Sequence, residues 1–288
     1  MSQILDGKAL ADKICLELKH RMDIVKENYL SATPSLVIVT SGDDSASKVY
    51  VRNKVRRCEE IGVKADVRHF DVVTPQIVDQ IAMENVPVIF QMPMTGTATM
   101  ETLQNYQWGG YDMDGFVDLN NVAKISTGKQ PLYYPCTPKG ILRLLAEYAI
   151  PLEGKSICII GRSNIVGRPL SWMMEQVGAT VTLCHSKTPE ETLYRAIQMA
   201  DVIVSATGVR NVISRDAMLQ YGEFDVANKV FVDVGMNRDE NGRLCGDIDP
   251  LILESSAAHT PVPGGVGPMT VAMLMENVVE YYGKAVGE

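Results

Sequence analysis

The hydrophobic positions of the chain switch repeatedly between the spacing of helices and that of buried strands. Five apolar residues near the amino terminus recur every three or four positions: Leu10, Ile14, Leu18, Met22 and Val25. This spacing predicts a helix with one apolar face. The next apolar stretch, SLVIVT at 35–40, is short and β-branched and ends in polar SGDD. It predicts a buried strand that opens into a loop.

The same alternation continues as far as about residue 94. Helices are predicted at 45–62 and 74–85, and strands at 65–70 (ADVRHF) and 87–94 (PVIFQMPM). Strands that alternate with helices favour a parallel sheet, because each helix carries the chain back to the starting edge. The first part of the chain therefore predicts a three-stranded parallel sheet covered by helices.

A second cycle of the same kind begins near Thr137. Its predicted strands, which are separated mostly by helices, are SICIIG at 156–161, TVTLCH at 180–185, DVIVSAT at 201–207 and VFVDVG at 230–235. This order is typical of a doubly wound sheet. The segment from Tyr106 to Pro138, rich in Gly, Asp, Asn and Pro, is interpreted as a domain boundary that could line a cleft. A last helix is predicted at 271–282.

Composition narrows the classes of protein. The chain has 288 residues, 46% of them hydrophobic, which is enough to fill the cores of two modest domains. Its net charge of -8, with no stripe of Lys and Arg, argues against nucleic-acid binding. No apolar run approaches the roughly 20 residues of a membrane span. The amino terminus resembles neither a signal peptide nor a transit peptide, so we expect a cytoplasmic protein.

The cysteines and histidines do not suggest a metal site. The six cysteines lie far apart with no C-x-x-C pair, and the four histidines are equally scattered. Structural and catalytic zinc sites need these residues at short, regular spacings. We therefore predict reduced core thiols and no bound metal.

The stretch GKSICIIGRSNIVGRPL at 154–170 predicts a strand, a glycine turn and a helix. Backbone N–H groups at such a helix start can bind a phosphate, and glycines let the ligand approach closely. Gly161, Ser163 and Gly167 stand where the usual G-x-G-x-x-G has its glycines, but with serine at the second one and a longer spacing. A plain strand-to-helix turn is the alternative interpretation.

The end of the following strand favours NADP over NAD. NAD-preferring sites usually have Asp or Glu at this place to bind the ribose hydroxyls. Here the strand runs into His185, Ser186 and Lys187, and Arg162 lies within the glycine turn. Donors and positive charge suit the 2'-phosphate of NADP, which a guanidinium can bind through two hydrogen bonds. Alternatively, Arg162 and Lys187 are solvated surface charges.

The amino-terminal half holds a second group of residues with chemical potential. Tyr50 and Lys54 are four positions apart and share one face of a predicted helix. Gln91 follows a predicted strand, and Asp114 lies in the turn-like segment DMDGF. Each also has a plainer interpretation, as a solvated helix face, a strand cap or a turn residue.

Taken together, these stretches resemble the bifunctional methylenetetrahydrofolate dehydrogenase/cyclohydrolase family along the whole chain. The matching stretches, in the family's order, are ILDGKALA, SASKVYVRNK, QMPM, DMDGF, YPCTPKGILRLL, GKSICIIGRSNIVGRPL, CHSKT, VFVDVGMNR and TPVPGGVGPMT. The resemblance implies an α/β protein of two domains around a cleft, with a three-layer folate-binding catalytic domain at 1–138 and 268–288. It implies a Rossmann-like NADP-binding domain at 139–267.

The resemblance also assigns roles to residues. Lys54 corresponds to the catalytic lysine, Tyr50 to a tyrosine that packs against the folate, Gln91 to a glutamine that contacts the lysine, and Asp114 to an aspartate that holds the pterin. The loop bordering the folate corresponds to Pro263, Gly264 and Gly265. The implied cofactor positions are Gly161, Arg162, Ser163, Ile165, Val166, Gly167, His185, Ser186, Thr207, Gly208 and Met236. A folate substrate and a homodimer joined through the middle domain are also implied.

Some positions depart from the family pattern. The usual QLPLP is QMPMT here, and Trp108–Tyr111 stand where a Pro-x-Lys precedes DVDG. Val117 and Asp118 replace His-Pro, and an expected glycine is Val122 or Ala123.

These departures leave two alternatives open beside the bifunctional activity. If the altered segment misplaces Lys54, the chain is a dehydrogenase without cyclohydrolase activity. A non-catalytic NADP-binding sensor or assembly subunit is another class, although the joint presence of Tyr50, Lys54, Gln91 and Asp114 argues against it.

Overall fold

The computed structural model describes residues 2–29, 33–43, 45–222 and 225–285. The chain divides into two compact units, and each unit combines two stretches of sequence. The three-stranded unit comprises Ala11–Cys136 and Val271–Glu288, and the six-stranded unit comprises Met1–Leu10 and Thr137–Thr270. The α/β class and the two parallel sheets predicted from the sequence are confirmed.

The three-stranded unit holds the elements from the first helix to the fifth, together with most of the last helix. They are α1 (Gly7–Tyr29), β2 (Ser35–Ser41), α2 (Ser45–Glu60), β3 (Lys64–Phe70), α3 (Pro75–Met83), β4 (Val88–Phe90), α4 (Met100–Gln104), α5 (Leu119–Ser126) and α11 (Val266–Ala285). The first residues of α1 and of α11 belong to the other unit.

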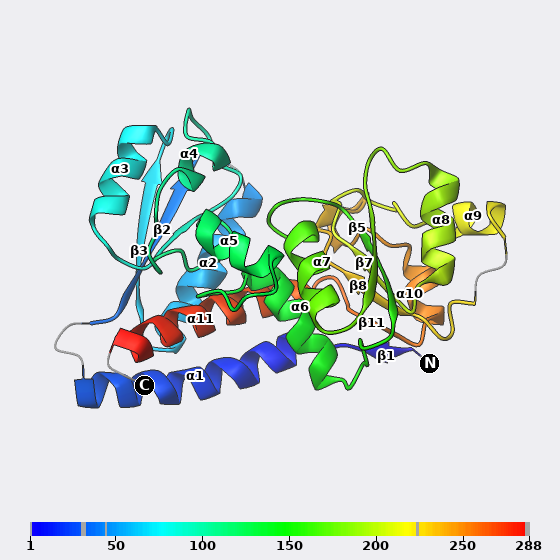
Figure 1. Cartoon of the computed structure of the whole chain (residues 1–288), viewed down its shortest axis with the longest axis horizontal. Coiled ribbons are helices and arrows are strands. Elements are labelled where there is room, and N and C mark those ends of the chain that lie inside the picture. The colour runs from blue at the N-terminus through cyan, green and yellow to red at the C-terminus, as the bar shows by residue number, and fades with distance from the viewer. Residues whose placement is uncertain (1, 30–32, 44, 223–224, 286–288) are drawn as a thin grey trace. The chain divides into compact units, whose positions relative to one another are not determined.

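Strand β2 is the centre of the small sheet, whose order is β3-β2-β4 and whose pairs are parallel. Its residues Leu36 to Val39 are almost completely buried, as expected of a strand covered on both faces. Helices α3 and α2 lie on opposite sides of this sheet, and α1 runs beside α11 (Figure 1). The apolar stripe predicted from Leu10 to Val25 is buried along α1.

The six-stranded unit holds the remaining elements. They are β1 (Gln3–Ile4), α6 (Cys136–Glu147), β5 (Ser156–Ile160), α7 (Gly167–Gln176), β6 (Thr180–Cys184), α8 (Glu190–Met199), β7 (Val202–Ser205), α9 (Arg215–Gln220), β8 (Val230–Asp233), β9 (Asn237–Arg238), β10 (Leu244–Cys245), α10 (Pro250–Ser255) and β11 (Ala258–His259). Only the first residue of α6 belongs to the three-stranded unit.

The large sheet is parallel throughout, in the order β1-β11-β8-β7-β5-β6. Helices α6 and α7 lie on one side of it and α8, α9 and α10 on the other (Figure 1). This doubly wound arrangement brings the carboxyl ends of β5, β6, β7 and β8 to one edge, where ligands bind in such folds.

Two features of this unit were not expected from the sequence. Strands β1 and β11 have two residues each, too few for a periodic signal, and Gln3 pairs with Ala258. Because β1 joins this sheet, residues 1–10 belong to the six-stranded unit, whereas the predicted boundary groups them with residues up to 138. A short antiparallel pair, β9 and β10, extends the chain after β8.

The segment from Tyr106 to Pro138 is more ordered than its composition suggests. It contains α5, and Asp118 caps this helix because its carboxylate accepts a hydrogen bond from the Asn120 N–H. No helix among the described residues is long and apolar enough to cross a membrane.

Candidate active site

Tyr50 and Lys54 lie on adjacent turns of helix α2, which belongs to the three-stranded unit. Lys54 is only 6% exposed, which is unusual for a lysine. Within the described part of the chain, its amine forms no hydrogen bond and no ion pair within 4 Å. A buried amine without such partners is costly for a fold, so it favours a site that a ligand completes. Burial also raises the pKa of the half-buried Tyr50.

Gln91 follows β4 and is held in the sheet by its backbone, because its N–H donates to the Val39 carbonyl at 2.9 Å. Its side-chain Nε2 donates to the Met92 carbonyl at 2.8 Å. The other end, Oε1, is buried and accepts no hydrogen bond from the described residues. An acceptor left in this state is available to an amine or to a ligand donor.

The two aspartates of DMDGF have opposite surroundings. Asp112, which is 5% exposed, accepts hydrogen bonds from the backbone N–H groups of Gly115 at 3.1 Å, Val117 at 2.8 Å and Asp118 at 3.0 Å. The carboxylate of Asp114, 7% exposed, accepts none from the residues that the structure describes. Asp112 therefore stabilises the turn through its hydrogen bonds. The carboxylate oxygens of Asp114 remain available to accept hydrogen bonds from a ligand.

Lys54 and Asp114 interact through their charges. Burial raises the pKa of Asp114, and the positive charge of Lys54 acts in the opposite direction and lowers it. The same unit also contains the buried, unpaired Gln91 Oε1. These groups offer hydrogen-bond acceptors for the N–H groups of a ligand, and a buried amine.

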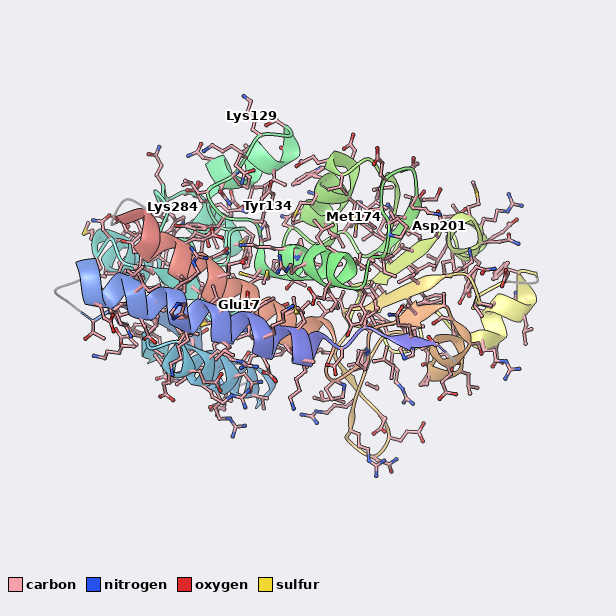
Figure 2. All side chains as sticks on the ribbon, turned by 90° about the horizontal axis from the view of Figure 1, so that it is seen from below. Glu17, Lys129, Tyr134, Met174, Asp201 and Lys284 are labelled. Carbon is pink, nitrogen blue, oxygen red and sulfur yellow. The ribbon has the colours of Figure 1, made fainter. Side chains whose placement is uncertain are left out.

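Two buried amides hold the backbone around Asp114. Asn121 accepts hydrogen bonds from the N–H groups of Leu132 and Tyr133 and donates to the carbonyls of Gly115 and Tyr133. Asn277 of α11 donates to the Met113 carbonyl at 2.9 Å. Lys284, near the end of the same helix (Figure 2), lies 4.8 Å from the centre of the Tyr133 ring.

The unusual Trp108 is part of the core rather than a surface insertion. It is buried, and its ring packs edge-on against Phe90 with centroids 5.3 Å apart. Its indole N–H donates to the Leu103 carbonyl at 2.9 Å. Val117 is likewise buried, and its N–H is one of the three donors to Asp112. Trp108 and Val117 are therefore part of the buried core of this unit, and Val117 also stabilises the DMDGF turn.

Protonation of Asp112 gives a testable pH dependence. Burial raises its pKa to about 7, against 3.8 in an ordinary setting. The folded protein thus holds this proton more tightly, so the stabilisation is complete below about pH 4 and is lost as the pH rises through about 7. Urea unfolding of the protein and of Asp112→Asn should show their stability difference falling by about 1.4 kcal/mol per pH unit in this window. Parallel pH profiles would refute it.

The glycine turn lies at the carboxyl edge of the large sheet. Gly161 has φ of +115°, and a Cβ there would lie 2.4 Å from the Ala206 carbonyl oxygen. A Cβ on Gly167 would lie 1.9 Å from the carbonyl oxygen of Gly161. Both positions thus require glycine for close packing of the turn. Ser163 accepts a hydrogen bond from the Val166 N–H at 3.1 Å, and Ile165 and Val166 are half-buried just before α7.

The end of β6 lies directly beside this turn, because the Gly161 N–H donates to the Cys184 carbonyl at 2.9 Å. His185 begins a tight turn in which its Nδ1 accepts the Lys187 N–H at 3.1 Å. Ser186 and Lys187 are exposed. Arg162 is also exposed, and its guanidinium has no ion pair or hydrogen bond within the described ranges. The edge therefore carries unpaired positive charge.

The loop after β7 contains Thr207 and Gly208, and the loop after β8 contains the exposed Met236. Both loops are organised by buried aspartates, Asp233 and Asp247, which the sequence analysis did not single out. The only available signal was the pair of acidic residues in VFVDVGMNR and GDID. Their importance depends on donors far away in the sequence.

Pro263, Gly264 and Gly265 belong to the six-stranded unit, just before α11. The Gly264 carbonyl accepts the Lys8 N–H at 2.8 Å. A Cβ on Gly265 would lie 2.7 Å from the Pro261 carbonyl oxygen, so this loop packs closely on the first turn of α1 and on itself.

The described residues contain no cluster of three or more His, Cys, Asp or Glu that could hold a metal ion.

The large sheet, its helices and its glycine turn have the architecture of a dinucleotide-binding domain. Comparison with known families agrees. Residues 135–286 match the NAD(P)-binding domain of tetrahydrofolate dehydrogenase/cyclohydrolase, and residues 5–104 match the catalytic domain of the same family. The chain belongs to the tetrahydrofolate dehydrogenase/cyclohydrolase family, as the sequence motifs indicated.

Relatives and solved structures cover nearly the whole chain. The bifunctional protein FolD of Nitrosomonas europaea is 40% identical, over 96% of this chain and 92% of its own length. The crystal structure of the FolD dehydrogenase/cyclohydrolase of Campylobacter jejuni has a TM-score of 0.88 and 36% identity, covering 99% of this chain and all of that one. The FolD of Trypanosoma brucei, solved with NADP and an inhibitor, has a TM-score of 0.87 and 26% identity, covering all of this chain and 99% of its own.

Proposed function

We propose that the protein oxidises 5,10-methylenetetrahydrofolate to 5,10-methenyltetrahydrofolate with NADP and hydrolyses this product to 10-formyltetrahydrofolate. One observation carries the proposal: in a member of this family, Lys54 and Asp114 are buried and interact through their charges, and neither their side chains nor the buried Gln91 Oε1 are hydrogen-bonded by the described residues. Such unmet polar groups favour a small polar ligand that satisfies them.

The folate would be held by Asp114 and Tyr50. A carboxylate with no donors of its own can accept two hydrogen bonds from the amino and ring N–H groups of a pterin. The half-buried Tyr50 ring, one turn of α2 from Lys54, offers a flat surface for the aromatic part of the substrate. Gln91 can orient the Lys54 amine through Oε1 without adding charge. Pro263, Gly264 and Gly265 are proposed to border the folate.

The residues of the large sheet suit NADP. The close-packed turn at Gly161 and Gly167 leads into α7, and its Arg162 is exposed and unpaired among the described residues. Together with Ser186 at the neighbouring strand end, Arg162 would bind the 2'-phosphate. When bound, NADP supplies the acceptor for the hydride of the bridge carbon. The remaining implied cofactor positions are proposed to line the same edge: Ser163, Ile165, Val166, His185, Thr207, Gly208 and Met236.

The two reactions make different demands on the chain. Loss of a hydride from the carbon bridge leaves a cation that both neighbouring nitrogens stabilise, so alignment and exclusion of water suffice. Hydrolysis of that cation adds water, which must lose a proton as it attacks. The Lys54 amine would accept that proton, because it is buried and forms no ion pair with the described residues.

Replacing Arg162 with Ala should raise the Michaelis constant for NADP far more than that for NAD. The guanidinium is exposed and has no partner among the described residues, so its removal should disturb only the ligand that carries the extra phosphate. Steady-state kinetics with both cofactors measure this. Arg168→Ala, in the first turn of α7, is a matched control because Arg168 already donates a hydrogen bond to Asn164. Equal changes for NADP and NAD would remove the assignment.

We also propose a homodimer joined through the six-stranded unit. Among the described residues, strand β6 ends that sheet and pairs with β5 alone, so its other edge could pair with a second copy. Sedimentation equilibrium at micromolar concentration should give about twice the 31.6 kDa of one chain. A mass near 31.6 kDa would contradict the dimer.

A cytoplasmic location without nucleic-acid or membrane partners completes the proposal. The six cysteines form no disulfide, as is usual in a reducing compartment. The net charge of -8 would repel nucleic acid.

The proposal is tested by incubating the purified protein with methylenetetrahydrofolate and either NADP or NAD. When both dinucleotides are used at the same sub-saturating concentration, NADPH should form more rapidly than NADH. Absence of cofactor reduction with both dinucleotides would contradict the dehydrogenase assignment.

A further inference from the structure

Asp247 is a completely buried carboxylate beside the loop that follows β7. Its Oδ2 accepts hydrogen bonds from the Ser205 hydroxyl at 2.9 Å, the Thr207 hydroxyl at 2.8 Å, the Thr207 N–H at 2.8 Å and the Gly208 N–H at 3.2 Å. Its Oδ1 accepts from the Asn237 side-chain amide at 2.9 Å. One side chain thus ties the end of β7, the loop 206–208 and β9 together.

The hydrogen-bond donors to the Asp247 carboxyl group are all neutral. Across the described ranges, no Lys, Arg or His forms an ion pair with it. Burial of a carboxyl group is costly unless hydrogen bonds replace its lost hydration. Three of these bonds come from Thr207 and Gly208, so the loop 206–208 is held at three points.

Asp233, at the end of β8, fixes Asp247 in turn. Its Oδ1 accepts the Asp247 N–H at 2.9 Å, and its Oδ2 accepts the Ile248 N–H at 3.0 Å. Two glycines make room for the pair. A Cβ on Gly235 would lie 1.9 Å from Asp247 Oδ1, and one on Gly246 would lie 1.9 Å from Asp233 Oδ2. The two aspartates form one buried network.

We infer that Asp247 is a positioning residue for NADP binding, which it supports by fixing the segment Thr207–Gly208 at the carboxyl edge of the sheet. The inference rests on the proposed function, because that segment is among the proposed cofactor contacts. It has a specific consequence. The N–H groups of Thr207 and Gly208 point into the protein and donate to Asp247, so they are not available to the dinucleotide. The cofactor instead meets the other side of the segment, where a Cβ on Gly208 would touch nothing within 4 Å.

The first test uses the unaltered, ligand-free protein. Although Thr207 and Gly208 lie in a loop and Gly208 is exposed, their amide hydrogens should exchange with solvent slowly, by at least about 100-fold relative to an unstructured peptide. Residue-resolved hydrogen exchange measures this. Free exchange at both amides would overturn the inference without any variant.

The second test compares Asp247→Asn with Asp249→Asn. The side chain of Asp249, two residues further on, accepts hydrogen bonds from the N–H groups of Leu251 and Arg215 and, among the described residues, none from the loop 206–208. Asp247→Asn should speed exchange at Thr207 and Gly208 and raise the Kd for NADP, measured by calorimetry, about tenfold, the equivalent of about 1.4 kcal/mol. The KM for NADP should rise while that for folate stays unchanged. Asp249→Asn should leave both exchange and Kd near the wild-type values.

The possible results distinguish a failure of the positioning role of Asp247 from a failure of the proposed function. A folded Asp247→Asn protein with unchanged exchange and unchanged Kd would refute the positioning role. Equal weakening by both substitutions would also refute it, since that pattern indicates general destabilisation. If the unaltered protein fails to bind NADP, the proposed function fails and the role toward NADP with it. The exchange comparison then still decides whether Asp247 anchors the loop.

Discussion

Lys54→Gln is expected to lower the cyclohydrolase rate by at least about 100-fold, the usual effect of losing a general base, and to lower the dehydrogenase rate much less. Glutamine keeps the length and polarity of the side chain but cannot take up a proton. Water addition to the methenyl cation releases a proton, whereas hydride loss from the methylene bridge does not. The substitution therefore separates the two chemistries of one pocket.

The surroundings of Lys54 make this substitution informative. Its amine is buried and forms no ion pair with the described residues, so Gln leaves no opposite charge stranded at hydrogen-bond distance. Lys48→Gln is the matched control, because Lys48 is exposed on the same helix and pairs with Asp43 at the surface. It should change neither rate. A parallel loss of both activities in Lys54→Gln would show that Lys54 mainly positions the folate.

Asp114→Asn is expected to weaken folate binding by about 2 to 4 kcal/mol and to reduce both activities. The carboxylate of Asp114 is buried and accepts no hydrogen bond in the described part of the chain, so its acceptors are free for the pterin. Asparagine places an NH2 group opposite the ligand's N–H groups, which leaves donors facing donors. Equilibrium titration with the folate measures the loss without depending on either rate.

The control for Asp114→Asn is the same change four residues further on. Asp118 caps α5 through the Asn120 N–H, and asparagine is an equally good cap. Asp118→Asn should therefore keep its folate affinity. If Asp114→Asn also keeps it, Asp114 is only a turn residue and the proposed pterin contact is wrong.

The sequence predicted the elements whose signal is local. The apolar stripe of α1 and the β-branched runs of β2, β5, β7 and β8 are confirmed, because burial on one or both faces imposes a regular spacing. Strands β1 and β11 were missed because two residues are too few to show an alternating pattern. The two strands also pair with each other from opposite ends of the sequence. Helix α5 was missed because Gly, Asp and Asn around it indicated a loop, although Asp118 caps it.

The candidate site was predicted in part for the same reason. The four-residue spacing of Tyr50 and Lys54 placed both on one helix, and motif resemblance supplied the roles. The sequence could not show that Asp112 is satisfied by three backbone donors whereas Asp114 has none among the described residues. Nor could it show that Asp247 accepts hydrogen bonds from four residues, Ser205, Thr207, Gly208 and Asn237. Such differences arise only when distant segments come together.

The altered segment around Trp108 raised the alternative of a dehydrogenase without cyclohydrolase activity. Trp108 and Val117 are buried in the three-stranded unit, and the backbone of Val117 supports Asp112. This ordered packing favours a segment that retains the turn bearing Asp114 rather than one that disrupts it.

The central claim, that one protein performs both reactions, is tested most directly by following methenyl- and formyl-tetrahydrofolate together. The purified protein is mixed with methylenetetrahydrofolate and NADP, methenyl is read by its absorbance, and formyl is quantified in quenched samples. We expect NADPH to form and 10-formyltetrahydrofolate to appear faster than methenyl hydrolyses in enzyme-free buffer, with little methenyl accumulating. Methenyl that accumulates in step with NADPH and decays only at the enzyme-free rate would contradict the claim.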